Sequence, residues 1–565
     1  MSKLRAAAFA AAFVLALTSC SAPSETIPAE PEPSAIVPTA TVEVTPAPTP
    51  DAYPMPEGIS DLPAFDLGEI YTRRYPEIVR EVRPADDYGR IIPFIGGIGL
   101  REYFDGTMFQ RGHSDYIYGF ATEAGEIICD AAFYSVYALE YEGKTVYLAQ
   151  RAARGTGFDL VSDVANAGVE THIISGDGGF AFAALDAQDI GGGYIAVKRD
   201  GYWGVINFSG AEILPAEYIA PPAFGDGLFV LMRSIGEGCY YADESGALVL
   251  GPYTLYSSFS DPGVDYSKRS VIRQIEDTWH YYLDTIAFSD GRALFVTDAV
   301  DRGSYYHNFR YGFIDKAGEL VIPDDFSNLV VPDGFSEDLA VVYSTDFDDK
   351  QEVLSERSAV IDTNGGIVLP WGEDDVYRNY DLFYRENADN SLVFYDKTGA
   401  VVRELNETGV YLGGGWFTEL SGDSISLIRG DKTYLTLPAG QNGAYITRAG
   451  DDRFVYACSE PDVYFTSLID AAGEVYLAAD TSGDERTSLY RDPGDELIRV
   501  FRGDGGLGFY TTDGEVVLPV EYEVAQPFPS SNGPLFTVRR GNYGGVVRPG
   551  GEWVVKVSLL DSLPD

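Results

Sequence analysis

Residues 202–228 read YWGVINFSGAEILPAEYIAPPAFGDGL. Two short apolar segments flank a Ser-Gly turn, and the second segment ends at a proline that is followed three residues later by a tyrosine. Short apolar runs bounded by glycine and proline are typical of antiparallel β-strands joined by tight turns. The positions that define this unit are Trp203, Gly204, Gly210, Pro215 and Tyr218. The stretch therefore predicts a small all-β module.

The same unit returns along the chain, most clearly at residues 311–342 and 507–538. The equivalent positions there are Tyr311, Gly312, Gly318, Pro323, Phe326, Gly508, Gly514, Pro519 and Tyr522. Turn glycines recur at positions 125, 210, 246, 318, 365, 399, 473, 514 and 550. A repeating unit of roughly 36–43 residues, with three degenerate copies, accounts for these intervals and predicts about a dozen units.

Each repeated position has a physical reason. In the Asp-x-x-Gly turns, the carboxylate accepts hydrogen bonds from turn amides and the glycine supplies a positive φ. Gly204, Gly312 and Gly508 permit a close approach of neighbouring backbone or a ring. The prolines end the second strand where no ladder donor is needed, and we expect Tyr218 and its equivalents to fold back over the core.

Together these positions resemble the WG-repeat family of bacterial proteins over about residues 88–556, although only Trp203-Gly204 keeps the name-giving dipeptide in its place. The resemblance implies placement on the cell surface and binding more than catalysis. Units of about 40 residues match the size of a propeller blade, and closure removes exposed sheet edges. We therefore predict one or two β-propellers built from short β-meanders, with an open β-solenoid array as the alternative.

The N-terminus carries an export signal. A basic start with Lys3 and Arg5 precedes the apolar run 6–17, as in a signal peptide. Leu17-Thr18-Ser19-Cys20 resembles the lipobox of bacterial lipoproteins, which implies lipidation of Cys20 and anchoring at the outer face of the bacterial cell membrane. Ten prolines among residues 21–58 predict a disordered, extended stalk.

The chain is thus divided into a signal peptide (1–19), a lipidated cysteine with a Pro/Ser/Thr/Glu-rich stalk (20–58), a lead-in segment (59–110), the repeat region (111–556) and a C-terminal tail (557–565). A division of the repeat region into two domains near residues 350–400 is one option. The remaining cysteines, Cys129, Cys239 and Cys458, are interpreted as small buried hydrophobes. One disulfide with a leftover thiol is the alternative.

The formal net charge of −47 disfavours nucleic-acid and anionic-lipid partners. The acidic residues are dispersed, which favours a solvated surface over binding of cations or cationic partners. Asp346-Phe-Asp348-Asp349 and Glu373-Asp374-Asp375 could hold calcium loosely, but neither has the EF-hand spacing, so solvated loops are favoured. We therefore predict no cofactor, with calcium as a weak option.

Catalytic motifs are few. The G-x-G-x-x-G match at residues 503–508 overlaps a repeat and opens a strand, whereas a dinucleotide cradle requires a following helix. The four histidines lack zinc-site spacing, and no G-x-S-x-G elbow occurs.

We therefore predict a non-enzymatic surface protein that binds a protein or a cell-envelope glycan. An exported glycan hydrolase with an unidentified carboxylate pair is the alternative. Aromatics in polar loops, which suit ligand stacking, are candidate contacts at Trp279, Tyr305 and Trp416.

Overall fold

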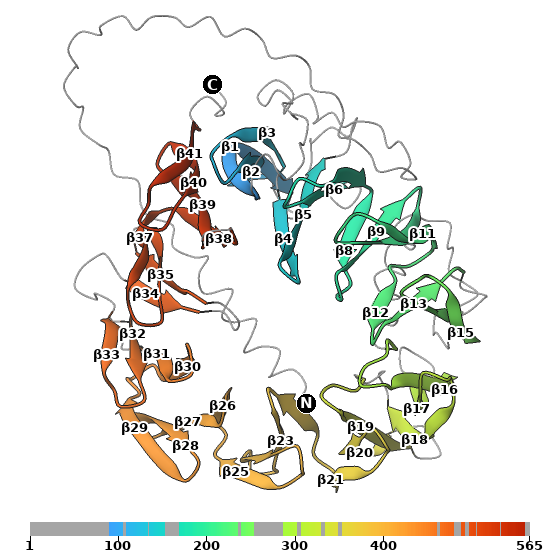
Figure 1. Ribbon diagram of the computed structural model, residues 1–565. Helices are drawn as coiled ribbons and strands as arrows, with labels where there is room; N and C mark the ends of the chain where they lie inside the picture. The colour runs from blue at the N-terminus through green and yellow to red at the C-terminus, as the bar shows by residue number, and fades with distance from the viewer. Residues whose placement is uncertain are drawn as a thin grey trace, which may run out of the picture. The chain divides into compact units, whose positions relative to one another are not determined.

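The computed structural model describes residues 90–104, 109–133, 135–152, 169–234, 239–253, 286–301, 307–328, 334–347, 353–459, 464–478, 487–491, 496–503, 505–530 and 533–559. These residues form 41 β-strands in eleven antiparallel sheets (Figure 1). Within them, no helix is long and apolar enough to cross a membrane. The predicted signal peptide, Cys20, the stalk, Trp279 and Tyr305 lie outside the described residues.

Each sheet is a meander of strands consecutive in the sequence, and we number the sheets as blades 1 to 11. Blade 1 contains β1 (Ile91–Phe104), β2 (Phe109–Thr122) and β3 (Ile127–Phe133), and blade 2 contains β4 (Ser135–Tyr141), β5 (Lys144–Ala152), β6 (Val169–Ser175) and β7 (Ala181–Ala184). Blade 3 contains β8 (Asp186–Asp189), β9 (Tyr194–Arg199), β10 (Tyr202–Asn207) and β11 (Glu212–Tyr218). Blade 4 contains β12 (Ala223–Gly225), β13 (Leu228–Met232), β14 (Cys239–Asp243) and β15 (Leu248–Tyr253).

Blade 5 contains β16 (Ala293–Asp301), β17 (His307–Ile314) and β18 (Leu320–Asn328). Blade 6 contains β19 (Leu339–Phe347), β20 (Val353–Asp362) and β21 (Ile367–Gly372). Blade 7 contains β22 (Val376–Asn379), β23 (Leu382–Glu386), β24 (Leu392–Tyr395) and β25 (Val401–Leu405). Blades 8 and 9 contain β26 (Val410–Gly413), β27 (Trp416–Ser421), β28 (Ser424–Arg429) and β29 (Lys432–Pro438); and β30 (Ala444–Arg448), β31 (Arg453–Ser459), β32 (Tyr464–Asp470) and β33 (Val475–Ala478). Blades 10 and 11 contain β34 (Thr487–Tyr490), β35 (Ile498–Arg502), β36 (Leu507–Tyr510) and β37 (Val516–Tyr522); and β38 (Val524–Phe528), β39 (Leu535–Arg540), β40 (Tyr543–Val547) and β41 (Trp553–Ser558).

The last two strands of a blade carry the repeated signature. Trp203 on β10 lies opposite Tyr218 on β11 in the strand register. The residue after Trp203 must be small, because a Cβ on Gly204 would lie 2.7 Å from the carbonyl oxygen of Leu214. The same approach recurs at Gly312 (2.4 Å) and Gly508 (2.6 Å), so the predicted close approach of the backbone is confirmed.

The turn between these two strands has the predicted chemistry. In blade 5, Oδ1 of Asp315 accepts hydrogen bonds from the backbone N–H groups of Ala317 (2.9 Å) and Glu319 (3.0 Å). Gly318 closes the turn with φ 82° and donates to the carbonyl oxygen of Asp315. The same carboxylate contacts occur at Asp243, Asp362, Asp396 and Asp470.

The turn glycines also join neighbouring blades. A Cβ on Gly399 of blade 7 would lie 2.1 Å from the carbonyl oxygen of Val368 on the last strand of blade 6. A Cβ on Gly514 of blade 10 would lie 2.6 Å from the carbonyl oxygen of Tyr476 in blade 9. Blade 1 makes this contact with blade 11, where a Cβ on Gly125 would lie 2.5 Å from the carbonyl oxygen of Val554.

The first and last blades are therefore packed together like blades that are consecutive in the sequence. The Thr537 hydroxyl of blade 11 donates a hydrogen bond to the Pro93 carbonyl of blade 1. Phe94 and Phe120 of blade 1 share a buried cluster with Phe528 of blade 11. The described residues thus form one eleven-bladed β-propeller, which confirms the propeller prediction and excludes the open array.

Two details differ from the sequence-based expectation. The 72 residues between Gly246 and Gly318 lead from blade 4 directly to blade 5, whereas their length predicts one more blade between the two. The described blades therefore number eleven instead of about a dozen. The extra length falls in residues 254–285, which are outside the described part. In addition, β1 begins at Ile91 within the expected lead-in segment, and β41 reaches Ser558 in the expected tail.

Candidate binding site on the turn face

In a four-stranded antiparallel blade, the turn between the first two strands lies at the same end as the turn between the last two. We call these the first turn and the last turn, and the surface that carries both the turn face. In blades 5 and 6, the bridge residues Ser289 and Ser336 stand in place of a first strand ahead of β16 and β19. In six blades the first turn has two residues: Glu142-Gly143, Asp226-Gly227, Asp290-Gly291, Glu337-Asp338, Tyr380-Asp381 and Gly414-Gly415. In blades 5 and 6 it is closed by a single bridge, Ser289 with Arg292 and Ser336 with Leu339.

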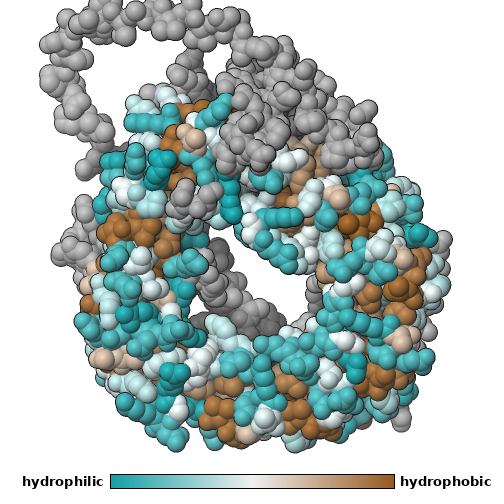
Figure 2. Space-filling view, in the orientation of Figure 1, coloured by the Kyte–Doolittle hydropathy of each residue, from teal (hydrophilic) through white to brown (hydrophobic). Residues whose placement is uncertain are grey.

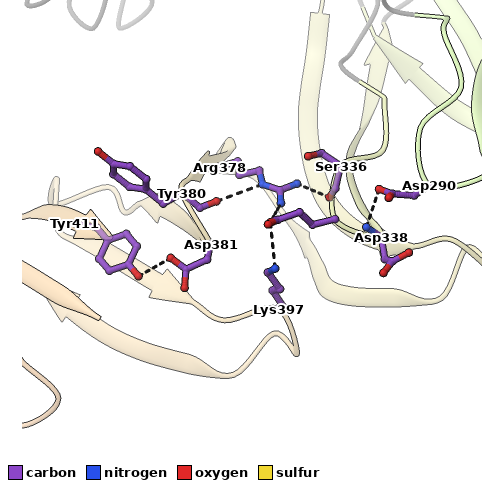
Figure 3. Close-up of polar contacts among 9 residues, drawn as sticks. Asp290, Ser336, Asp338, Arg378, Tyr380, Asp381, Lys397 and Tyr411 are labelled. Carbon is purple, nitrogen blue, oxygen red and sulfur yellow. Dashed lines mark hydrogen bonds and ion pairs between the residues drawn. The ribbon is translucent and has the colours of Figure 1, made fainter. Parts of the chain in front are cut away.

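Carboxylates connect the first turns of consecutive blades. Oδ2 of Asp226 in blade 4 accepts a hydrogen bond of 2.6 Å from the backbone N–H of Gly291 in blade 5. Oδ2 of Asp290 in blade 5 accepts one of 2.8 Å from the backbone N–H of Asp338 in blade 6 (Figure 3). We call this series the turn ladder. Its carboxylates satisfy turn amides of the next blade and fix the spacing of the turns.

Between blades 6 and 7, the arginine Arg378, and not a carboxylate accepting from a turn amide, connects the two first turns (Figure 3). Its Nη1 donates to the Ser336 carbonyl at 2.5 Å, and its Nη2 forms an ion pair with Glu337. Lys397, in the last turn of blade 7, lies 3.1 Å from the same carboxylate. Hydrogen bonds from Lys397 and Arg378 lower the pKa of Glu337.

Between blades 7 and 8, Oδ1 of Asp381 accepts a hydrogen bond of 2.6 Å from the Tyr411 hydroxyl. That hydroxyl in turn accepts one of 3.1 Å from the backbone N–H of Gly415. Burial, followed by the hydrogen bond to Asp381, raises the pKa of Tyr411 to about 12. Tyr411 is therefore a neutral donor that holds the Asp381 carboxylate in place.

The ladder is interrupted in blade 8, where Gly413, Gly414 and Gly415 have φ values of 83°, 60° and 80° and present no side chain. An open pocket of about 510 Å³ lies there. It is lined by Ser336, Glu337, Arg378, Tyr380, Asp381, Gly413, Gly414 and Arg448. The missing side chain thus coincides with a concave polar site on the turn face.

Arg448 of blade 9 forms one wall of this pocket. Its Nε donates to the Gly450 carbonyl at 2.8 Å, and its Nη2 to Oδ1 of Asp451 at 3.1 Å. Its Nη1 points to the glycine turn, because a Cβ on Gly414 would lie 2.7 Å from that atom. Among the described residues, Nη1 has no hydrogen-bond acceptor. The Nη1 group, with its two N–H bonds, is therefore available at the pocket wall.

Of the aromatic residues singled out in the sequence, Trp203 and Trp416 lie in the described part of the chain and do not line this pocket. Trp203 is 2% exposed and packs in a cluster with Tyr218 and Phe229. Trp416 is also 2% exposed, with its ring 5.0 Å from that of Phe454 and covered by Arg429. The expectation that Trp416 is an exposed ligand contact is therefore wrong, because the residue begins strand β27 and its side chain packs into the core.

None of the side chains that line the pocket was predicted as a site from the sequence. The signal that could have revealed it is Gly413-Gly414-Gly415, a side-chain-free turn at a position where four other blades carry Asp or Glu. Recognising this requires the first turns to be aligned, and they are less regular than the Asp-x-x-Gly turns.

The structure also bears on the metal and thiol predictions. Among the described residues, no group of three or more His, Cys, Asp or Glu side chains is arranged to hold a metal. Asp348 and Asp349 of the candidate calcium segment lie outside the described part. Cys129, Cys239 and Cys458 are buried and form no disulfide, as predicted. Burial raises the pKa of Cys239 to about 12, so this thiol is protonated at neutral pH.

The profile of the WG containing repeat family matches residues 311–343 and 508–543. The chain contains WG repeats. The first matched segment runs from β17 of blade 5 to β19 of blade 6, and the second from β36 of blade 10 to the first residue of β40 in blade 11. Each segment therefore includes a turn glycine and crosses a blade boundary. The family motif therefore describes the joint between blades.

Solved structures similar to this WG-repeat chain include the designed Ika8 protein, with 11% identity over 65% of this chain and 94% of that one and a TM-score of 0.25. BamB from Moraxella catarrhalis has 14% identity over 56% and 88% and a TM-score of 0.24. The WD40 β propeller domain of Doa1 has 15% identity over 45% and 91% and a TM-score of 0.18. No curated protein matches the sequence.

Proposed function

We propose that this chain is a lipid-anchored protein of the outer cell surface that binds a protein or cell-envelope glycan partner through its turn face and catalyses no reaction. The observation that carries the proposal is the contrast between the two sets of turns on that face. The last turns repeat one Asp/Asn chemistry in blades 3 to 7 and 9, whereas the first turns differ from blade to blade.

Packing explains this contrast. The last turns are constrained because their glycines contact the preceding blade, as Gly399 contacts Val368. The first turns are less constrained, since a Cβ on Gly143 or Gly291 would meet nothing within 4 Å. A rigid scaffold with variable loops at one end is a common arrangement for binding surfaces.

The surface composition agrees with a role in recognition. On the face shown in Figure 2, hydrophobic residues gather in separate clusters flanked by hydrophilic ones. Non-obligate interfaces are about as apolar as the rest of a protein surface, so such a mixed face suits a reversible partner. The lipobox and the proline-rich stalk support the anchored, extracytoplasmic part of the proposal.

The pocket carboxylates favour binding over glycoside hydrolysis. A hydrolase needs one carboxylic acid with a raised pKa as general acid. Glu337 has the opposite property, because Lys397 and Arg378 lower its pKa. Asp381 is engaged by the Tyr411 hydroxyl.

The test is to incubate the full chain with peptidoglycan, envelope polysaccharides and envelope proteins, measuring both retention and the release of reducing ends. We expect retention without release. Turnover that is lost on substitution of a single Asp or Glu would establish the hydrolase instead.

Anchoring is tested separately by expressing Cys20→Ala, with Ser21→Ala as the neighbouring control. We expect only Cys20→Ala to lose membrane association. If both variants remain on the membrane, the anchoring part of the proposal is wrong.

A further inference from the structure

We propose that the pocket at the first turn of blade 8 binds a sugar residue that carries a carboxylate, with Arg448 contacting the carboxylate and Tyr380 stacking on the sugar ring. This inference rests on the proposed function, since it names the ligand chemistry of one site on the turn face.

The preference for a carboxylate follows from the turn ladder. Asp226 and Asp290 place a carboxylate at the first position of their turns, and each accepts a hydrogen bond from the next blade. Gly414 stands at that position in blade 8 and brings none. The guanidinium of Arg448, from the following blade, lies over Gly414, with Nη1 2.7 Å from where a Cβ would stand. A ligand carboxylate would supply the missing acceptor, and charge-assisted hydrogen bonds of this kind are roughly twice as strong as neutral ones.

Arg378 plays a different part in the same pocket. Its three nitrogens already donate to Tyr380, Ser336 and Glu337. It therefore holds the wall of the pocket in shape, whereas Arg448 is the residue with a free donor. The two arginines are accordingly expected to respond differently to substitution.

The preference for a sugar follows from the rest of the lining. Tyr380 is 57% exposed, and its ring meets that of Tyr411 edge to face at 6.0 Å, which supports it from one side. Polar side chains and glycine make up the remaining lining, with no aliphatic residue among those described. A peptide anchor would require an apolar pocket at its centre. An aromatic face next to polar groups instead suits a sugar ring.

The charge of the whole chain limits the ligand further. With a net charge of −47, the protein repels a polymer with a carboxylate on every unit. We therefore infer isolated uronic acid residues within an otherwise neutral glycan.

Gly414→Asp tests the inference directly, because an added Cβ would lie 2.7 Å from Nη1 of Arg448. The new side chain must therefore displace the guanidinium from the pocket wall and would bring a carboxylate of the protein to pair with it. Aspartate tolerates the left-handed backbone, as Asp226 and Asp290 show with φ of 50° and 52°, and Gly414 has φ 60°. The matched control is Gly422→Asp in the same blade, where φ is 59° and a Cβ would meet nothing within 4 Å. Gly422 lies between β27 and β28, at the opposite end of the blade.

The experiment titrates a glucuronic acid-containing disaccharide into the full chain by calorimetry. Its neutral glucose analogue and an acetylated glutamyl peptide serve as comparison ligands. We expect the uronate to bind at least tenfold more tightly than either comparison ligand. Gly414→Asp and Arg448→Gln should each weaken it at least tenfold, while Gly422→Asp binds like the wild type. Unchanged far-ultraviolet circular dichroism and melting temperature confirm that the variants are folded.

Several outcomes overturn the inference. Uronate binding that survives Gly414→Asp would place the ligand elsewhere, and tighter binding of the glutamyl peptide would make the ligand a protein. If no probe binds but the chain still captures an envelope component, the pocket assignment fails and the proposed function stands. If nothing in the envelope is captured, the proposed function itself fails.

Discussion

Three different side chains occupy the position before the close-approach glycine in blades 3, 5 and 10. Trp203, Tyr311 and Leu507 are each buried and each lie opposite an aromatic residue on the following strand. The buried hydroxyl of Tyr311 has a hydrogen-bond partner, since it accepts a hydrogen bond of 2.9 Å from the backbone N–H of Tyr343 in the next blade. In blades 3, 5 and 10 the position thus requires a large apolar body, and the polar atom is secondary.

This requirement gives the first prediction. Trp203→Ala should destabilise the protein by about 3–5 kcal/mol, because it removes a fully buried aromatic side chain and leaves a cavity. Trp203→Tyr should cost much less, since blade 5 already carries tyrosine there. Urea denaturation measures both. Equal stability of the alanine variant and the wild type would show that the indole does not anchor its blade.

The turn aspartates give a prediction about pH. The Thr398 hydroxyl and backbone amides donate hydrogen bonds to Asp396 and lower its pKa in the folded state. The unfolded chain therefore binds this proton more readily, so stability present at neutral pH should be lost as the pH falls through the acidic range. Asp396→Asn should reduce the acid sensitivity while keeping the turn, because Asn207 forms the same turn in blade 3. A urea midpoint with the same pH dependence in both proteins would contradict this.

At the scale of the blade, Gly312 on β17 should not be replaceable without a loss of stability. In Gly312→Ala, the added methyl group would lie 2.4 Å from the Ile322 carbonyl, so we expect a loss of about 1–3 kcal/mol. Gly450→Ala is the control, because its Cβ would meet Arg453 at an ordinary 3.5 Å. Thermal unfolding should separate the two variants clearly. A similar melting temperature for both would mean that the strand relaxes without cost.

The features of a blade that the sequence predicted are local. An Asp-x-x-Gly turn involves residues within four positions of one another, so its hydrogen bonds can be derived from the sequence. The expected number of blades depends on the lengths between turns, and the 72-residue interval between Gly246 and Gly318 joins consecutive blades instead of spanning the two units that its length predicts. The pocket could not be predicted from local sequence patterns, because its walls come from turns that are far apart in the sequence, from Ser336 to Arg448.

At the scale of the whole molecule, closure depends on the contact between blades 1 and 11. Both blades are formed by consecutive strands, so no strand is exchanged between the two ends. Their joint consists of the Thr537–Pro93 hydrogen bond, the shared apolar cluster and the approach of Gly125 to Val554. Nothing covalent distinguishes this joint from the others, yet it alone must form between residues over 400 positions apart in the sequence. Such non-local contacts are entropically the most costly to form.

We therefore expect this joint to be the first to open. Gly544→Ala should promote the opening, because its methyl group would lie 2.3 Å from the Ile95 carbonyl of blade 1. Hydrogen exchange should accelerate in β1, β39 and β40 while blades 6 to 8 keep their protection, since sub-global opening exposes only the amides involved. Gly541→Asn is the control within blade 11, because its φ of 58° tolerates asparagine and its surroundings are open. If Gly544→Ala instead accelerates exchange equally in all blades, the propeller unfolds as one cooperative unit and closure is no weaker than any other joint.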